Sequence, residues 1–381
     1  MLSHPGLRAI AAYFFVYYAF LGVFSPFWGP YLRALGVPMS IIGLMISLPQ
    51  INRIYAPALW AWCADHFGHR RMILRIAGMG GFVGFIVLLV TQDISWMFAA
   101  IFVASFFWSA AIPQVEAITM SLLKGDSGSY ARLRAWGSIG FMVATLIGGY
   151  LMEHFGVQTM PRLVVVVMAG VAILVWWVPD APAAPTHTRS SGGLAAIFRR
   201  TEIQALFVGC LLMGAAHGLL HGFYSIHLDE HGIAKSTLGW LWALGVMAEI
   251  LLFWFMPSLS RRFRARSMYL CAMGVAVVRY LMIGWGTGWL GILIVAQLMH
   301  AFTFGVHHAV SISYVHRLFD PAHQTQGQAF YIVFTFGIGG SLGTLLTGLL
   351  WSSLGGNWLF SLASVASLLA LLVCWRGLKE V

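Results

Sequence analysis

Five ionisable side chains of this 381-residue chain fall within or at the ends of long apolar runs: Glu116, Arg134, Glu249, Arg279 and His300. A charge inside a bilayer is costly unless it is paired or lies in a hydrated cavity. Carboxylates and imidazoles in such places can exchange protons, and a guanidinium can bind a carboxylate through two hydrogen bonds. These residue types predict a polar pathway for an anion and for protons through a membrane protein.

The elements that must hold these side chains are membrane-spanning helices. Apolar residues make up 60% of the chain and charged residues only 9%, whereas soluble domains carry roughly 25% charged residues. The apolar runs are continuous, which favours helices over the alternating strands of a barrel. We expect an all-α membrane protein with twelve transmembrane helices, over residues 9–32, 40–62, 72–91, 95–122, 131–152, 162–178, 203–228, 236–257, 268–286, 288–315, 327–350 and 356–376.

The basic residues between the predicted spans indicate how the chain lies in the membrane. Most of the 22 lysines and arginines fall in loops on one side, and only Arg33, Arg162 and Lys235 fall on the other. Because Lys and Arg are retained on the cytoplasmic side, we expect both termini in the cytoplasm of a bacterial cell and the spans in its inner membrane. The net charge of +10 is dispersed beside membrane helices, so we expect contact with lipid and none with nucleic acid.

A polar segment near the middle of the chain separates six predicted spans from the next six. Residues 179–202 are rich in Pro, Ser and Gly, a composition typical of a flexible linker. We expect an N-terminal half over residues 1–178, a cytoplasmic linker over 179–202 and a C-terminal half over 203–381. Two six-helix halves with internal symmetry, enclosing a site near the bilayer midplane, are a known transporter design.

In the first half, Glu116 lies near the end of the fourth predicted span and Arg134 opens the fifth. An antiparallel helix pair can bring the two side chains level, so we expect them to pair until an anionic ligand competes. A purely structural ion pair is the alternative. Arg53 lies well inside the second span, where it either snorkels to the nearer surface or lines the cavity as a second anion partner.

In the second half, polar and aromatic side chains repeat at helical spacing along the tenth predicted span. One face holds Gln297, His300, Phe304, His307 and His308. The pair His217 and His221, one turn apart in the seventh span, is expected to line the same cavity. Since no carboxylate or cysteine completes a ligand set in the seventh span, we expect no metal site there.

Several of these residues resemble a known family. Asp65, Gly68, Arg70 and Arg71 resemble the loop signature of the major facilitator superfamily, with Ala61 where its first glycine is usual. Within that superfamily the chain resembles the 3-phenylpropionic acid transporter group, which is related to lactose permease and nucleoside/proton symporters. The resemblance covers nearly the whole chain and is carried by Pro26-Phe27-Trp28, Arg53, Arg134-x-Trp136-Gly137-Ser138, Gly214-x-x-His217, Gly222-Phe223, Gly239-x-Leu241-Trp242-x-Leu244-Gly245-Val246-x-Ala248-Glu249, Val278-Arg279 and Gln297-x-x-His300-x-x-Thr303-Phe304-x-x-x-His308.

The resemblance implies a major facilitator fold and roles for particular residues. Glu116 and Arg134 are similar in spacing to the substrate-site pair of lactose permease. Thr303 stands where that permease has its principal carboxylate proton carrier, so Glu249 or His300 is the expected proton site; simple neutralisation of Glu249 by Arg279 is the alternative. The expected proton-coupling residues are Glu249, Arg279, His300 and His308, and the expected gating loop comprises Asp65, Gly68, Arg70 and Arg71.

Two differences from lactose permease narrow the class of ligand. Phe141 stands where lactose permease has the tryptophan that stacks on the sugar ring, and Leu252 where it has an asparagine that binds hydroxyls. A polyhydroxylated ligand would lose these partners, whereas an aromatic carboxylate would find apolar faces and an arginine. The expected substrate-binding residues are Arg134, Glu116, Arg53, Phe27, Phe141, His217 and Phe304.

The sequence therefore predicts a monomeric, proton-coupled symporter that imports a small aromatic monocarboxylate, such as 3-phenylpropionate, by alternating access and without a cofactor. Alternatives of the same fold are a sugar or nucleoside symporter and a drug exporter. A channel or a non-transporting receptor is the alternative of a different class. An enzyme is not expected: the chain has no H-E-x-x-H motif and no complete P-loop.

Overall fold

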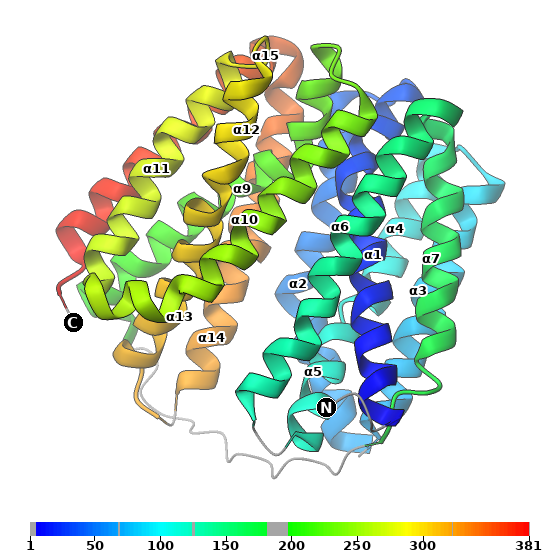
Figure 1. The fold of residues 1–381 in the computed structure, drawn as a ribbon, viewed down its shortest axis with the longest axis horizontal. Coiled ribbons are helices and arrows are strands. Elements are labelled where there is room, and N and C mark those ends of the chain that lie inside the picture. The colour runs from blue at the N-terminus through cyan, green and yellow to red at the C-terminus, as the bar shows by residue number, and fades with distance from the viewer. Residues whose placement is uncertain (1–4, 68, 124–125, 181–196, 322, 381) are drawn as a thin grey trace. The chain divides into compact units, whose positions relative to one another are not determined.

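The computed structural model describes residues 5–67, 69–123, 126–180, 197–321 and 323–380, and these residues form helices and no strands (Figure 1). Two helical segments, η2 and η3, are π-helices, and η1 is a 3₁₀ turn. The elements in chain order are α1 Pro5–Ala34, α2 Met39–Phe67, α3 Arg70–Val90, α4 Ile94–Trp108, α5 Ala111–Leu122, α6 Ser127–Phe155, η1 Val157–Thr159, α7 Met160–Leu174, α9 Thr201–Glu230, α10 Lys235–Arg262, α11 Ala265–Trp285, α12 Leu290–Leu298, η2 Ala301–Val306, α13 His307–Leu318, α14 Gln324–Ile332, η3 Val333–Gly339 and α15 Gly340–Gly377.

Ten helical segments among the described residues are long and apolar enough to cross a membrane, which confirms the predicted all-α membrane protein. The last, Gln324–Gly377, covers two predicted spans, and Gly355 breaks its helical backbone between them with a φ of +75°. The helix α2 occupies the second predicted span but is not among the ten, because Gln50, Asn52 and Arg53 lower its hydropathy. The count of twelve spans therefore stays a prediction.

The chain forms two compact units. The first contains residues 1–38, 51–187 and 234–243, and the second contains residues 39–50, 188–233 and 244–381. The start of α2 belongs to the second unit and the start of α10 to the first, and the bounds of the two halves stay a prediction. Most of the predicted linker, residues 181–196, lies outside the described residues.

In the first unit, α1 packs against α6 and α7, and α3 packs against α4 and α7 (Figure 1). Glycines let α1 and α6 approach closely: a Cβ placed on Gly22 would lie 2.9 Å from Thr145 Oγ1. The Thr145 hydroxyl donates to the Gly22 carbonyl oxygen at 3.0 Å. Small residues and a hydroxyl bond between helices are typical of packing inside membranes, where burial of apolar surface contributes little.

In the second unit, α9 packs against α15 and η3 through the same device. The Thr344 hydroxyl donates to the Gly218 carbonyl oxygen at 3.0 Å. Thr145 and Thr344 lie in the fifth and eleventh predicted spans, and Gly22 and Gly218 in the first and seventh. The matching threonine–glycine contacts support the internal repeat suggested by the sequence, because each contact joins the first and fifth helices of its own half.

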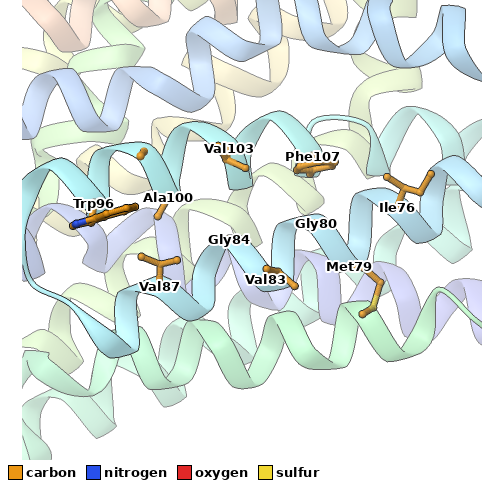
Figure 2. Close-up of a pocket in the computed structure, with 11 residues that line it drawn as sticks. Ile76, Met79, Gly80, Val83, Gly84, Val87, Trp96, Ala100, Val103 and Phe107 are labelled. Atoms are coloured by element: carbon orange, nitrogen blue, oxygen red, sulfur yellow. The ribbon is translucent and has the colours of Figure 1, made fainter.

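A groove of about 640 Å³ lies on the first unit between α3 and α4 (Figure 2). Gly80 and Gly84 form part of its wall, and the exposed side chains of Val83 and Trp96 border it. Apart from the indole N–H of Trp96, the lining side chains are apolar. The groove therefore suits hydrocarbon and offers nothing that could hold a carboxylate.

Gly140 provides a test of the close approach of α6 to α1. A Cβ at this position would lie 2.9 Å from Phe15 Cα and 2.7 Å from its carbonyl carbon, so Gly140→Ala must push the helices apart. We expect a loss of about 1–3 kcal/mol in stability, as for other overpacked sites. The matched control is Gly274→Ala, whose new methyl would meet Leu371 at an ordinary 3.5 Å. Thermal unfolding of the purified protein in detergent measures both, and a Gly140→Ala variant as stable as Gly274→Ala would contradict the packing described.

Candidate functional site

The first group of candidate residues lies on α6 in the first unit. Asp126 caps the start of this helix, because its Oδ1 accepts hydrogen bonds from the backbone N–H groups of Gly128 at 3.0 Å and Ser129 at 3.2 Å. The hydrogen bonds from Ser129 hold the pKa of Asp126 below its ordinary value. An ionised N-cap stabilises the helix start, and this start lies two turns before Arg134.

The guanidinium of Arg134 lies over an aromatic surface contributed by α1. Its central carbon is 3.9 Å from the centre of the Tyr18 ring and 6.0 Å from that of Phe14. Gly137 leaves room for this arrangement, since a Cβ there would lie 2.6 Å from Tyr18 Cδ2 and 2.9 Å from Arg134 Nη1. A half-buried cation held on aromatic rings by cation–π attraction is suited to bind an anion that itself carries an aromatic group.

The direct contact predicted between Glu116 and Arg134 is not formed in the described part of the chain. Glu116, on α5, instead accepts a hydrogen bond at 2.9 Å from the hydroxyl of Tyr130, which lies one turn before Arg134 on α6. The tyrosine satisfies the carboxylate, and the arginine turns to Tyr18. Spacing along the chain brought the two helix ends together but could not show that a tyrosine hydroxyl would take the carboxylate.

The other predicted substrate residues of the first unit lie in different surroundings. Phe27, on α1, is fully buried, and a Cβ at Gly148 of α6 would lie 3.3 Å from its ring, so its contacts are those of core packing. Phe141, on α6, is half-buried, and its carbonyl oxygen accepts a hydrogen bond from Thr145 at 2.7 Å. Arg53, on α2, is exposed. These three side chains do not converge on Arg134 in the way that Tyr18 does.

The predicted gating loop is described in part. Arg70 and Arg71 begin α3, and Arg71 Nη2 donates to the carbonyl oxygen of Trp176 at 2.8 Å. Gly68 and the side chain of Asp65 lie outside the described residues. The gating role of this loop stays a prediction.

The group of candidate residues in the second unit is centred on Arg279 of α11, which is fully buried. Its Nε donates to the Ala296 carbonyl oxygen at 2.8 Å, its Nη1 to Thr303 Oγ1 at 2.8 Å and its Nη2 to Gln297 Oε1 at 3.4 Å. The guanidinium is thus held by neutral oxygens from α12 and η2. Thr303 contacts the arginine from the position where the resemblance places a carboxylate in lactose permease.

Glu249 of α10 lies beside His300 rather than forming one of these arginine contacts. Glu249 Oε2 is 3.8 Å from His300 Nε2, and the glutamate side chain keeps 20% of its surface exposed. Two glycines allow α10 to approach: a Cβ at Gly245 would lie 3.1 Å from Gln297 Oε1, and one at Gly305 would lie 3.6 Å from Glu249 Cγ. A carboxylate facing an imidazole can share and pass on a proton.

A column of rings extends from His300 along η2 and α13. The rings of His300 and Phe304 stack at 5.3 Å, and those of Phe304 and His308 at 6.1 Å. His217 of α9 faces this column, with its ring centre 6.3 Å from that of His300 and 5.9 Å from that of Phe304. The predicted residues of the second unit therefore do come together, whereas those of the first unit do so only in part.

Other features of the described residues limit what the site can do. They contain no group of three or more His, Cys, Asp or Glu side chains placed to hold a metal ion. The letters of a G-x-S-x-G motif occur at residues 339–343, but Ser341 lies inside a helix, buried, and donates to the Gly337 carbonyl oxygen at 2.6 Å. A nucleophile elbow requires an exposed serine on a strand-to-helix turn, so this segment is a helix-packing feature.

Comparisons with known proteins match most of the chain. Residues 7–362 match the MFS_1 like family. The chain is 26% identical over 361 residues to the "Probable 3-phenylpropionic acid transporter" of Escherichia coli, covering 94% of this chain and 95% of that protein. It is 20% identical over 357 residues to the nucleoside permease NupG of the same organism, covering 84% of each. A crystal structure of a NupG mutant superposes with a TM-score of 0.88 at 17% identity, covering 98% of this chain and 100% of that one.

Gly137 tests the placement of Arg134. The methyl group of Gly137→Ala would displace either the Tyr18 ring or the guanidinium, and a displacement of about 1 Å in a binding group can cost on the order of 100-fold in rate. We expect the half-saturation concentration for uptake of the compound that the wild-type protein accumulates to rise by at least about tenfold. Gly128→Ala on the same helix, whose methyl would meet Asp126 Oδ1 at 3.4 Å, is the control. Equal half-saturation in the two variants would contradict this placement.

Thr303 tests the neutral cage of Arg279. In Thr303→Val the guanidinium loses a buried acceptor, whereas Thr303→Ser keeps it. Loss of a hydrogen bond to a buried charge is expected to lower stability by about 1.5–3 kcal/mol. Unfolding of the purified variants in detergent gives the difference, and a valine variant as stable as the serine variant would show that this bond is not needed.

Proposed function

The chain belongs to the MFS_1 like family and is a multi-pass secondary transporter of the major facilitator superfamily, and from this premise we propose that it imports a small aromatic monocarboxylate, such as 3-phenylpropionate, together with protons. In this proposal the protein acts as a monomer in a bacterial inner membrane, with both termini in the cytoplasm. Arg134 binds the carboxylate, and Glu249 and His300 hold the proton.

The observation that carries the proposal is the position of the Arg134 guanidinium, 3.9 Å above the Tyr18 ring. In the described part of the chain no carboxylate forms an ion pair with this arginine, and the nearby Glu116 is held by Tyr130. An incoming carboxylate can therefore use the fork of N–H donors while its aromatic ring packs beside Tyr18, which is half-buried. A sugar or nucleoside would bring hydroxyls that apolar ring faces do not satisfy.

Coupling to protons is supported by the different partners of the Arg279 guanidinium and the Glu249 carboxylate in the second unit. Arg279 is held by neutral oxygens, and Glu249 Oε2 lies 3.8 Å from His300 Nε2. A proton taken from the outside can bind between Glu249 Oε2 and His300 Nε2, and the loaded pair carries one positive charge more than the empty pair. That charge offsets the negative charge of the substrate, so the loaded carrier can cross its transition without moving an uncompensated anion through the membrane.

A second candidate is a proton-coupled nucleoside symporter. It is favoured by the nucleoside permease relative, whose sequence aligns over 84% of this chain. The likeness to the NupG crystal structure supports the shared fold and does not choose between substrates, since the identity is 17%. The uptake experiment therefore includes a nucleoside.

Uptake into proteoliposomes tests the proposed substrate. Labelled 3-phenylpropionate, cinnamate, a disaccharide and a nucleoside are each offered with and without an inward acid gradient, and vesicles without protein are used to subtract passive entry of the acids. We expect saturable accumulation of the two aromatic acids that depends on the gradient, and none of the other two compounds. Accumulation of the nucleoside instead would replace the proposal with its rival, and uptake that neither saturates nor runs uphill would indicate a channel.

Two sets of variants test the proposed roles. Arg134→Gln is compared with Arg75→Gln, because Arg75 also lies over an aromatic ring, 4.3 Å from that of Trp176, and has no proposed role. We expect Arg134→Gln to lower acid uptake at limiting substrate by at least about 30-fold, the cost of roughly 2 kcal/mol of charge-assisted hydrogen bonding, and Arg75→Gln to leave it within about twofold. Equal uptake in the two would refute binding by Arg134.

Glu249→Gln and His300→Gln separate coupling from binding. Each removes a proton-binding group but keeps a side chain of similar size, so we expect exchange of internal for external acid to continue while accumulation driven by the pH gradient is lost. Retained uphill accumulation in both variants would contradict the proposed proton site.

A further inference from the structure

A second group of hydrogen-bonded side chains lies closer than the proposed proton site to the end of the unit at which α9 begins and α13 ends. The proposed function gives these side chains no role. Ser311 Oγ donates to the Tyr269 hydroxyl at 3.1 Å, and the Tyr269 hydroxyl is 3.2 Å from His307 Nε2. Cys210 Sγ is 3.4 Å from the same hydroxyl. The side chains of these four residues are buried.

A second contact extends this group to α14. His308 Nδ1 lies 2.8 Å from the Tyr331 hydroxyl, and Tyr331 is almost fully buried. We call the six residues the lower cluster: Cys210, Tyr269, His307, His308, Ser311 and Tyr331. They come from four segments, α9, α11, α13 and α14.

Along both α9 and α13, the lower cluster lies on the same side of the proton site. Cys210 precedes His217 on α9 by two turns, and His307 follows His300 by about two turns, which is about 10 Å at 1.5 Å per residue. In both cases the displacement runs toward the end of the unit at which α9 begins and α13 ends. In the proposed orientation this end faces the cytoplasm.

A small cavity joins the two levels. It has a volume of about 10 Å³, room for about one water molecule, and it is lined by Met213, His217, Phe304, His307, His308, Tyr331, Thr335 and Phe336. His217 Nδ1 is 2.8 Å from the Met213 carbonyl oxygen, so the neutral ring carries its proton on this nitrogen. Its Nε2 is buried and has no hydrogen-bond partner in the described residues, and so it is a basic nitrogen free to accept a proton.

We propose that His217 and the lower cluster form the route by which the proton leaves Glu249 and His300 for the cytoplasm. This inference rests on the proton coupling proposed above. The proton passes from His300 to His217 Nε2, between rings whose centres are 6.3 Å apart, then through a water molecule in the cavity to His308 or His307, on to Tyr331 or Tyr269, and finally to water at the cytoplasmic end of the unit. Each group accepts a proton on one atom and releases one from the same or the other heteroatom, so no group keeps a net charge and no bond other than O–H or N–H changes. Imidazoles and hydroxyls in contact are the usual carriers of such transfers.

Replacing a tyrosine of the lower cluster by phenylalanine tests the route, because it removes the hydroxyl and keeps the aromatic ring. Tyr331→Phe and Tyr269→Phe break contacts within the lower cluster, and Tyr13→Phe is the matched control, since Tyr13 is equally buried in the first unit and its hydroxyl has no partner among the described residues. Each variant is reconstituted with the substrate that the wild type accumulates in the four-compound panel. Two rates are measured: net uptake driven by an acid gradient, which requires proton release, and exchange at equal pH, which does not.

We expect Tyr331→Phe and Tyr269→Phe to slow net uptake by at least about tenfold relative to Tyr13→Phe, at the low end of what a positioned proton-transfer group contributes, and to leave exchange within about twofold of it. An equal loss in both modes would show that the cluster only stabilises the fold, and no loss in either would show that protons leave by another way; both results overturn the route. Accumulation of a nucleoside instead of an acid refutes the proposed substrate, yet the comparison of the two modes with that nucleoside still decides the route.

Discussion

A guanidinium buried in a membrane protein must have its donors satisfied, and the second unit of this transporter is built around one that is satisfied by neutral oxygens. Arg279 donates to the Ala296 carbonyl oxygen, to Gln297 and to Thr303, which ties α11 to α12 and η2. The same ties fix the helix segment that carries His300, whose Nε2 lies 3.8 Å from Glu249 Oε2. If Arg279 were neutralised by Glu249 instead, the carboxylate would be locked in an ion pair and could not take up and release a proton with each cycle.

Close helix packing allows polar groups of neighbouring helices to meet inside each unit. Thr145 bonds to Gly22 in the first unit as Thr344 bonds to Gly218 in the second. Glycines also bring α10 against η2, where Gly305 lies near Glu249. Two π-helical segments, η2 and η3, occur next to the candidate site. Such segments mark places where the regular ladder of hydrogen bonds is relaxed, and they are frequent at functional sites.

Much of the fold could be predicted from composition and periodicity, and less of the site could. Apolar runs located the membrane helices to within a few residues, and helical spacing placed His300, Phe304 and His308 on one face, where their rings stack. Spacing along a helix sets the depth of a residue but not the rotamer of its side chain, so it could not show that Glu116 accepts from Tyr130 while Arg134 lies over Tyr18. The contacts of Tyr269 and Tyr331 join helices that are distant in sequence, and no local pattern could have revealed them.

In the proposed mechanism a proton moves with the substrate because Glu249 and His300 hold it inside the membrane. The most direct measurement is the pH of a weakly buffered suspension of unenergised proteoliposomes, with potassium and valinomycin to clamp the voltage, when 3-phenylpropionate salt is added outside. We expect the medium to become more alkaline as the substrate enters, by more than with protein-free vesicles, and we expect this excess to be absent with Glu249→Gln. Substrate entry by the wild-type protein without any excess alkalinisation would contradict this mechanism.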